Sequence, residues 1–398
     1  MPPHDAPSTF LTRVRLRDYR SIARCDVALE PLTILVGPNG AGKSNFLDAL
    51  RFTTEGLRDS LEHALRERGG FFEVCRKDPA HDVQFGVRLD FLLEGQPGHF
   101  AFAIHGNPND GAFVVSNETC AWKGSHYEVR IGDLVHRPAV VSPPASSDRL
   151  YLGNAAGLPA FRPVFDALST MGFYNPSPAS LREPHARESG ELLDRDGGNL
   201  ASVLARLDQT NPLAKQRIDE YMARVVPGIE GVTIVRIGRV DTVEFRQRIA
   251  GAPQAWSFPA SNMSDGTLRA LAVLTALFQF GERRTARLVG IEEPETALHP
   301  AALGLLMDGL REGVRDRQVV ITTHSPDLLD SDAIASEQLL SVIAVGGRTI
   351  IGAVDAASRD ALRDSLYRPG ELLRLGQLEP DPASISDADD VHLFEPAS

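Results

Sequence analysis

The feature that most constrains the fold is one short segment that matches the pattern GxxxxGK[ST] in full. Its residues are Gly37, Pro38, Asn39, Gly40, Ala41, Gly42, Lys43 and Ser44. The apolar run Leu32–Val36 precedes it, and from Asn45 onward apolar residues recur with helical spacing. A buried strand, a glycine-rich turn and a helix in this order are typical of a phosphate-binding loop. We therefore expect an α/β P-loop NTPase that binds ATP.

The chemistry of this segment follows from its residue types. Glycines let backbone N–H groups face phosphate oxygens with no side chain in the way, and the positive end of the following helix dipole points to the same place. Lys43 is expected to reach the β- and γ-phosphates, and Ser44 to ligate Mg²⁺. The sequence thus predicts ATP and Mg²⁺ as cofactors.

A second apolar strand, Leu288–Ile291, leads into two adjacent carboxylates, Glu292 and Glu293. A P-loop enzyme needs one carboxylate near the metal and another to polarise the attacking water. Because consecutive residues of a strand point to opposite sides, the two can have different roles. We assign Glu292 to the metal side and Glu293 as general base.

Two further polar turns lie close by in the sequence. His324 follows the apolar strand Val319–Ile321, where it can donate to a γ-phosphate and sense its loss. Ser264, Asp265 and Gly266 precede a strongly apolar helix, with Ser264 or Asp265 as the natural N-cap. Taken alone, this second turn is a capped, buried helix; taken with the other motifs, it is a second anion-binding helix end.

The rest of the chain divides by its periodicity. Residues 10–22 alternate as a half-exposed strand, and the helical pattern after Asn45 runs to Gly69-Gly70. Residues 83–131 predict an antiparallel meander, residues 138–200 loops with short helices, residues 200–225 a helix, and residues 233–249 a strand pair. From 268 to 354 helices and strands alternate, which favours a parallel sheet flanked by helices, followed by a hairpin at Gly346-Gly347.

These patterns predict four segments. Residues 1–137 form an N-terminal lobe with the phosphate loop and an antiparallel β subdomain, and 138–255 a helical insertion with a strand pair. Residues 256–355 form a C-terminal lobe with the acidic pair, and 356–398 an extension. The end of this extension, from Gln377, carries six carboxylates and no Lys or Arg, so we expect a loosely held acidic tail.

Composition narrows the class of protein. The net charge of −12 argues against a chain coated in positive charge for nucleic acid. Three widely spaced cysteines without a CxxC indicate neither a disulfide framework nor a zinc site. The N-terminal residues Pro2–Asp5 carry no secretory pattern, and no apolar run is long enough to span a bilayer. We expect a cytoplasmic protein with no membrane partner.

The order of the motifs resembles RecF, SMC and OLD-type ATPases of the ABC class. It runs from the phosphate loop through the Ser-Asp-Gly helix, Glu-Glu-Pro-Glu, Ala-Leu-His-Pro (297–300) and Thr-His-Ser-Pro (323–326). The opening Arg17-Asp18-Tyr19-Arg20-Ser21-Ile22 also looks like the first strand and turn of RecF-like proteins. The likeness is greatest to compact stand-alone bacterial ATPases of the AAA family. The resemblance implies an ABC/SMC-head-like fold with a mixed central sheet, an antiparallel β subdomain and a helical insertion.

The resemblance also implies roles. Gly37–Ser44 is the Walker A loop, with Arg20 and Asn45 beside the nucleotide; Ser264, Asp265 and Gly266 stand at the signature; Glu292 and Glu293 end Walker B; His324 is the switch histidine. In this class the signature of one copy completes the ATP site of a second copy, so an ATP-dependent homodimer is expected. The chain departs from the ABC pattern in having Glu292 where Asp is usual, and in lacking the transporter signature and a coiled coil.

Several functions remain open. We favour an ATP-hydrolysing switch in DNA maintenance or antiphage defence over a nucleotide-gated scaffold that holds a partner toxin or nuclease. A transporter motor and a small-molecule kinase fit the motifs less well. Arg13, Arg15 and Arg17 share a strand face that DNA could contact, although a solvated edge strand is the preferred interpretation.

Overall fold

The computed structural model describes residues 9–77, 83–107, 111–137, 141–279, 286–330, 334–382 and 392–394. Residues Pro2–Asp5 and most of the acidic tail lie outside the described residues. The chain forms two compact units. The loop unit comprises Ser8–Met171, Ala335–Tyr367 and Leu372–Ser398, and the carboxylate unit is built on Gly172–Ile334 and Arg368–Glu371. The four predicted segments stay a prediction.

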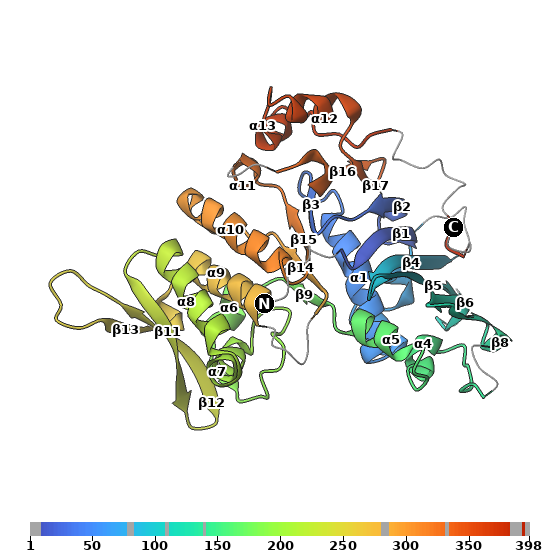
Figure 1. The fold of residues 1–398 in the computed structure, drawn as a ribbon, viewed down its shortest axis with the longest axis horizontal. Coiled ribbons are helices and arrows are strands. Elements are labelled where there is room, and N and C mark those ends of the chain that lie inside the picture. Colours follow the sequence, from blue (N-terminus) through green and yellow to red (C-terminus); the bar gives the residue numbers. More distant parts are fainter. Residues whose placement is uncertain are drawn as a thin grey trace. The chain divides into compact units, whose positions relative to one another are not determined.

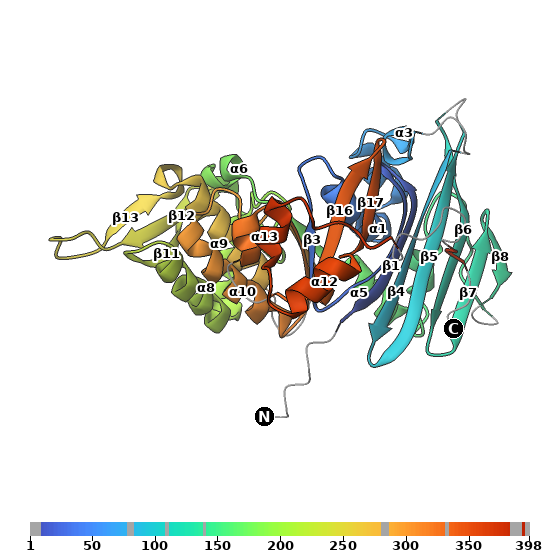
Figure 2. The ribbon, with the colours of Figure 1, turned by 90° about the horizontal axis from the view of Figure 1, so that it is seen from above.

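The loop unit is built on a mixed sheet with the strand order β8-β7-β6-β5-β4-β1-β2-β17-β16-β3. Neighbours pair antiparallel except β2 with β17 and β16 with β3, which are parallel. Figure 2 shows β4 to β8 following one another as the predicted meander. The strands are β1 (Leu11–Tyr19), β2 (Ile22–Ala28), β3 (Leu32–Val36), β4 (Gln84–Leu93), β5 (Gln96–Gly106), β6 (Phe113–Trp122), β7 (Ser125–Arg130), β8 (Asp133–His136), β16 (Leu339–Val345) and β17 (Arg348–Ala353).

Aromatic side chains join this sheet to helix α1 (Lys43–Arg58), which lies against it in Figure 1. Phe85 of β4 makes edge-on contacts with Phe52 of α1 and with Tyr19 of β1, at centroid distances of 5.4 and 5.5 Å. All three are buried, and each buried aromatic ring stabilises the fold by about 2–3 kcal/mol. The core therefore fixes the helix that begins at the phosphate loop. The remaining helices of the unit include α2 (Leu61–Arg66), α3 (Phe71–Val74), α4 (Tyr151–Ala155), α5 (Arg162–Ser169) and α12 (Ala356–Arg363), while α13 (Pro369–Arg374) crosses the unit boundary.

Three expectations for the loop unit need correction. The helical pattern to Gly69 is broken after Arg58, because Ser60 accepts a hydrogen bond from the His63 amide and caps a new helix. β1 is an internal strand between β2 and β4, and therefore not a solvated edge. The described part of the tail is packed and not loose: Leu378 and Leu393 are 6% and 5% exposed.

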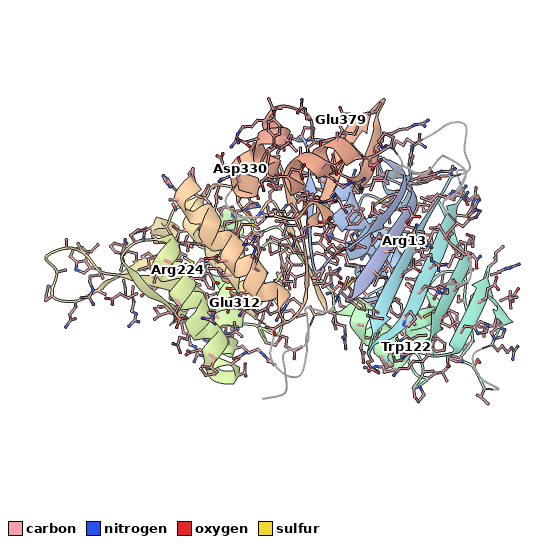
Figure 3. All side chains as sticks on the ribbon, turned by 45° about the horizontal axis from the view of Figure 1, so that its top comes forward. Arg13, Trp122, Arg224, Glu312, Asp330 and Glu379 are labelled. Carbon is pink, nitrogen blue, oxygen red and sulfur yellow. The ribbon has the colours of Figure 1, made fainter. Side chains whose placement is uncertain are left out.

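The carboxylate unit has three parallel strands, β9 (Gly172–Tyr174), β14 (Leu288–Glu292) and β15 (Gln318–Thr323). The alternating pattern predicted β14 and β15, whereas β9 lies in a segment that was predicted as loops with short helices. Helices α8 (Pro212–Val225), α9 (Asp265–Phe278) and α10 (Leu303–Val314) pack on one another, and Figure 3 labels Arg224 of α8 and Glu312 of α10. α9 is buried along most of its length, as expected of its apolar sequence. The other helices include α6 (Pro178–Arg182), α7 (Leu200–Thr210) and α11 (Pro326–Asp330).

A smaller antiparallel sheet completes this unit. It contains β10 (His185–Ala186), β11 (Ile229–Ile237), β12 (Val240–Gln247) and β13 (Trp256–Pro259), with β12 paired to the other three strands. The predicted strand pair at 233–249 is β11 with β12. The predicted single helix 200–225 is two helices, because Asn211 caps α8 and Pro212 cannot continue α7. Across the part of the chain that the structure describes, no helix combines the length and apolar character needed to cross a bilayer.

Candidate functional site

The predicted phosphate loop connects β3 to α1. Lys43 is the first residue of α1 and is 5% exposed, and its Nζ donates to the carbonyls of Gly37 and Pro38 at 2.8 and 3.0 Å. No side chain caps the first turn of this 16-residue helix, and no acidic residue lies in it. A helix end of this kind, with an ammonium beside it, suits an anion. Ser44 is exposed at the same end, where its hydroxyl is accessible to a metal ion.

Two glycines of the loop are required by close packing. Gly42 has a φ of 100°, and a side chain there would lie 2.0 Å from the hydroxyl of Thr349 in β17. A side chain at Gly37 would lie 2.0 Å from the carbonyl oxygen of Val342 in β16. The β16–β17 hairpin therefore backs the loop at both ends, which the sequence pattern of the loop did not reveal.

Arg20 and Asn45, both predicted beside the nucleotide, have protein partners. Arg20 lies in the β1–β2 turn with a φ of 50°, and its Nε is 3.1 Å from the carboxylate of Asp48. The side-chain amide of Asn45 donates to the hydroxyl of Ser21 at 2.6 Å. Their contact with nucleotide stays a prediction.

Asp48, on the second turn of α1, is the centre of an ion-pair cluster that sequence reasoning missed. Its carboxylate accepts hydrogen bonds from Arg68, Arg51 and the hydroxyl of Tyr19. Burial alone would raise the pKa of Asp48, but Arg68, Arg20 and Arg51 lower it to about 2. The cluster fastens α1 to the β1–β2 turn and to the end of α2.

The two adjacent carboxylates, Glu292 and Glu293, are separated by a change in backbone conformation and not by strand alternation. Glu292 is the last residue of β14, whereas Glu293 has left the strand with a φ of 43°. Glu292 pairs with Arg195 at 2.7 Å. The two side chains thus differ in surroundings because of a left-handed turn at Glu293 and not because of the pleat of a strand, and their different roles stay a prediction. A non-glycine residue in this conformation costs about 1–3 kcal/mol and is typical of functional sites.

Glu293 and His324 lie together. His324 Nδ1 is 3.1 Å from Glu293 Oε1, and the two side chains are 40% and 33% exposed. The backbone N–H of Glu293 donates to the carbonyl and to the hydroxyl of Thr322, at the end of neighbouring β15. Strands β14 and β15 are adjacent and parallel (Figure 1), and the predicted base and the predicted switch histidine lie together directly after their ends.

Arg269 of α9 organises the backbone behind this pair. Its guanidinium donates to the carbonyls of Glu292, Glu293 and Pro176 and to the side-chain oxygen of Asn175, at 2.8–3.3 Å. Burial lowers the pKa of Arg269, against the nearby carboxylates that raise it. Arg269 was not predicted from the sequence, although an arginine three residues after Gly266 in a strongly apolar helix was the available signal.

Glu295 is a third carboxylate beside the acidic pair. It is 6% exposed, accepts a hydrogen bond from the Thr323 hydroxyl, and its other oxygen is buried with no partner. Burial raises the pKa of Glu295. The nearby carboxylate of Glu293 acts in the same direction on the pKa of Glu295.

The signature turn has the cap that was predicted. Ser264 is the N-cap of α9, and its hydroxyl accepts from the Thr267 amide at 3.2 Å. Ser264 and Asp265 are exposed, and Asp265 also pairs with Arg182. Gly266 is buried, where a side chain would lie 2.2 Å from the Ala297 carbonyl oxygen. The two polar residues of the turn are therefore on the surface of the carboxylate unit.

The arginine face of β1 is neutralised within the chain. Arg13 pairs with Asp26, and Arg15 with Asp26 and Asp90 at 3.3 and 3.4 Å. Arg17 lies 3.5 Å from Asp18. Figure 3 labels Arg13 on this sheet. Because these arginines are already paired with carboxylates of the same chain, a structural role is favoured over direct contact with DNA phosphates.

Two family models match the chain. The model described as "AAA domain, putative AbiEii toxin, Type IV TA system" matches residues 171–330, close to the bounds of the carboxylate unit. The model described as "AAA ATPase domain" matches residues 10–88, in the loop unit. The predicted motifs are therefore covered by two ATPase models, one for each unit.

Curated relatives of the chain include RecF proteins and an OLD nuclease. The DNA replication and repair protein RecF of Magnetococcus marinus is 35% identical over 115 residues, which cover 28% of this chain and 29% of that protein. The OLD nuclease of Thermus scotoductus is 26% identical over 351 residues, 83% of this chain and 62% of that protein. The resemblance to RecF/SMC/OLD-like ABC-class ATPases is confirmed. This RecF/SMC/OLD-like chain spans less than two thirds of the curated relatives named.

The fold is that of an SMC head. An SmcHead bound to the C-winged helix domain of ScpA superposes with a TM-score of 0.56 at 14% identity, covering 88% of this chain and 99% of that one. An Smc head with an extended coiled coil, bound to the C-terminal domain of ScpA derived from Pyrococcus furiosus, gives 0.55 at 14% identity, covering 90% and 99%. The predicted α/β P-loop fold with a mixed sheet is therefore confirmed.

The residues present fit a magnesium ion that arrives with a nucleotide. In the described ranges, no group of three or more His, Cys, Asp or Glu side chains could hold a metal on its own. Mg²⁺ commonly keeps several waters and takes one or two protein ligands plus substrate phosphates. Ser44 in the loop unit and Glu292 in the carboxylate unit, the predicted ligands, each offer one oxygen, and their joint role in holding Mg²⁺ stays a prediction.

Proposed function

We propose that this chain binds Mg-ATP through Gly37–Ser44 and hydrolyses it with Glu293 as general base. The observation that carries the proposal is the helix end at Lys43: a complete phosphate-loop sequence on a helix whose first turn has neither a side-chain cap nor an acid. Such an end attracts phosphate by its backbone N–H groups and its dipole. Bound ATP and Mg²⁺ would supply the reacting phosphoanhydride and the metal charge.

The chain's own residues then have separate tasks. Lys43 neutralises phosphate charge, and Ser44 and Glu292 hold the metal ion. Glu293 accepts a proton from water, and His324, 3.1 Å away, orients that carboxylate and donates toward the γ-phosphate. Positioning and charge stabilisation of this kind account for most phosphoryl-transfer catalysis.

The proposal extends to a homodimer and to a switch in DNA maintenance or antiphage defence. Ser264 and Asp265 are exposed polar residues at a helix N-terminus, so they are available to a nucleotide held by a second copy. Nucleotide binding would close the dimer and hydrolysis would open it. This part rests on the resemblance and on the exposure of the turn.

Turnover tests the catalytic claim. We expect Glu293→Gln to bind ATP as the wild type does and to lose about 100-fold in phosphate release, because a general base contributes at least that much. Glu220→Gln, a half-exposed glutamate of α8, is the matched control and should keep the wild-type rate. Equal near-zero rates for wild type and Glu293→Gln, with ATP bound, would instead support the nucleotide-gated scaffold.

Sizing chromatography tests the dimer. Glu293→Gln with ATP should elute at twice the mass seen without ATP. Ser264→Asp keeps a residue that caps helices but adds a negative charge toward the triphosphate, so it should stay monomeric, whereas Ser264→Asn, a neutral cap, should still dimerise. A monomer for every variant with ATP bound would contradict the dimer.

A further inference from the structure

A polar relay under the phosphate loop joins three segments that are far apart in the sequence. The side-chain amide of Asn45 donates to Ser21 Oγ at 2.6 Å. Ser21 Oγ lies 2.7 Å from Thr349 Oγ1, and Thr349 Oγ1 donates to the carbonyl of Ala41 at 2.8 Å. The relay thus starts at Asn45 in α1, directly after the loop, and ends at Ala41 in the loop, on either side of Lys43.

The direction of each hydrogen bond can be assigned. A hydroxyl has one hydrogen to donate. The Thr349 hydroxyl donates its hydrogen to the Ala41 carbonyl, which can only accept. Ser21 must therefore donate to Thr349, which leaves the lone pairs of Ser21 to accept from Asn45. All three bonds run one way, and chained bonds of this kind strengthen one another.

The backbone reinforces the relay at the same place. The N–H of Thr349 donates to the carbonyl of Ser21 at 2.8 Å, where β17 meets β2. Thr349 is 3% exposed, and its side chain fills the space that a Cβ on Gly42 would take. Because Gly42 is pressed against Thr349, the left-handed turn that precedes Lys43 has little room to change shape.

We infer that Thr349 and Ser21 are positioning residues for nucleotide: they hold the turn at Gly42–Ser44 in its phosphate-binding shape before any ligand arrives. The inference rests on the proposed function, since it concerns the same loop. A loop that is ordered in advance does not lose conformational entropy on binding, so its affinity is higher. The residues of the β16–β17 hairpin, some 300 positions from the loop, therefore set the affinity for the phosphates.

The relay predicts which substitutions weaken binding. Thr349→Val keeps the shape of the side chain but leaves the Ala41 carbonyl and Ser21 without their partner. We expect about tenfold weaker binding of both ATP and ADP, which is in the lower part of the range for two lost hydrogen bonds. Thr349→Ser keeps the hydroxyl and should bind within about twofold of wild type. Thr242→Val, a threonine on β12 in the other unit, is the matched control.

Two measurements distinguish an effect on the position of the loop from an effect on the stability of the fold. In steady-state turnover, Thr349→Val should raise KM for ATP about tenfold with kcat within about twofold, because the groups that act on water are elsewhere. Hydrogen exchange of nucleotide-free protein should be faster at the Lys43–Asn45 amides in Thr349→Val than in Thr349→Ser. If Thr349→Val does not fold, Ser21→Ala, which is only partly buried, takes its place.

A double-mutant cycle tests that the residues act as one chain. Because Ser21 acts through Thr349, the double variant should bind ATP no more than about twofold more weakly than Thr349→Val alone. Wild-type affinity in Thr349→Val, equal loss in Thr349→Ser and Thr349→Val, or fully additive losses would each overturn the inference. Failure of wild-type protein to bind ATP would overturn the proposed function as well, so the two failures are distinguishable.

Discussion

The phosphate loop and the carboxylate cluster are held by different kinds of contact. Around the loop, Lys43 and Thr349 are 5% and 3% exposed, and their bonds go to backbone carbonyls and hydroxyls. At the acidic pair, Glu293 and its partner His324 are 33% and 40% exposed, and Arg195 on Glu292 is 46% exposed. Buried bonds fix geometry, whereas half-exposed ion pairs are worth about 1 kcal/mol or less and are screened by salt.

This difference suggests that the loop and the carboxylates have different functions. The loop is shaped before ligand arrives, because every change of shape would break buried hydrogen bonds. The carboxylates form half-exposed ion pairs, which can be broken at a low cost in free energy. Such weak pairing suits a group that must take up a metal ion or a proton. Substitutions in the two regions should therefore differ in the size of their effects on stability.

The largest expected effect is that of Gly42→Ala. The new side chain would be strained at a φ of 100° and would collide with Thr349 Oγ1 at 2.0 Å. Strain and overpacking together should cost about 3 kcal/mol or more of unfolding free energy, measured by denaturant titration. Gly346→Ala, at a φ of 56° with open space around it, is the control and should cost about 1 kcal/mol. Equal losses would mean that the loop is not tightly supported.

Asp48→Asn comes next. Removing one charge from a cluster with Arg68 and Arg51 should cost about 3 kcal/mol at pH 7, because the arginines lose their buried counter-ion. The pKa of Asp48 is about 2 in the folded protein and about 3.8 as the unperturbed value. A carboxylate whose pKa is lower in the folded state stabilises that state at pH values above its unfolded pKa. This contribution of Asp48 to the unfolding free energy, about 2 kcal/mol, should therefore be lost as the pH falls from about 4 to about 2.

The control for this pH series is Asp360→Asn, an exposed aspartate paired with Arg363. It should change the unfolding free energy by less than about 0.5 kcal/mol at either pH. If the loss caused by Asp48→Asn is the same at pH 7 and pH 2.5, the ion-pair account of the cluster is wrong.

The smallest expected effect is that of Arg195→Gln in the carboxylate region. The pair with Glu292 is half exposed at the arginine, so its loss should cost about 0.5 kcal/mol, and less in high salt. Thermal unfolding at low and high sodium chloride measures it, with Arg217→Gln on α8 as a variant of similar exposure. A loss above about 2 kcal/mol would erase the contrast between the two regions.

Local patterns were enough to predict most elements and the residues of each motif. The phosphate loop, the Ser264 cap and the parallel strands that end just before Glu293 and His324 follow from spacing, capping and periodicity within short windows. The break at Ser60 and the two helices at Asn211-Pro212 were missed because the apolar period continues through them, although both caps were visible in the sequence.

What could not be predicted depends on contacts between distant segments. Nothing near Thr349 or Asp48 in the sequence marks them as supports of the loop, since their partners are brought together only by the sheet. The pairing of Arg13 and Arg15 with Asp26 and Asp90 is of the same kind, because it requires β1 to lie between β2 and β4. The left-handed turn at Glu293 is held by hydrogen bonds from its backbone N–H to Thr322 on the neighbouring strand.

Calorimetric titration of ATP and Mg²⁺ into wild type and Lys43→Ala tests the central claim most directly, with Lys77→Ala, an exposed lysine paired with Glu73, as control. Because the proposal places the buried Lys43 ammonium against phosphate oxygens, Lys43→Ala should bind ATP about 100-fold more weakly, and Lys77→Ala should bind it unchanged. Wild-type affinity in a folded Lys43→Ala would contradict the assignment of the loop as the nucleotide site.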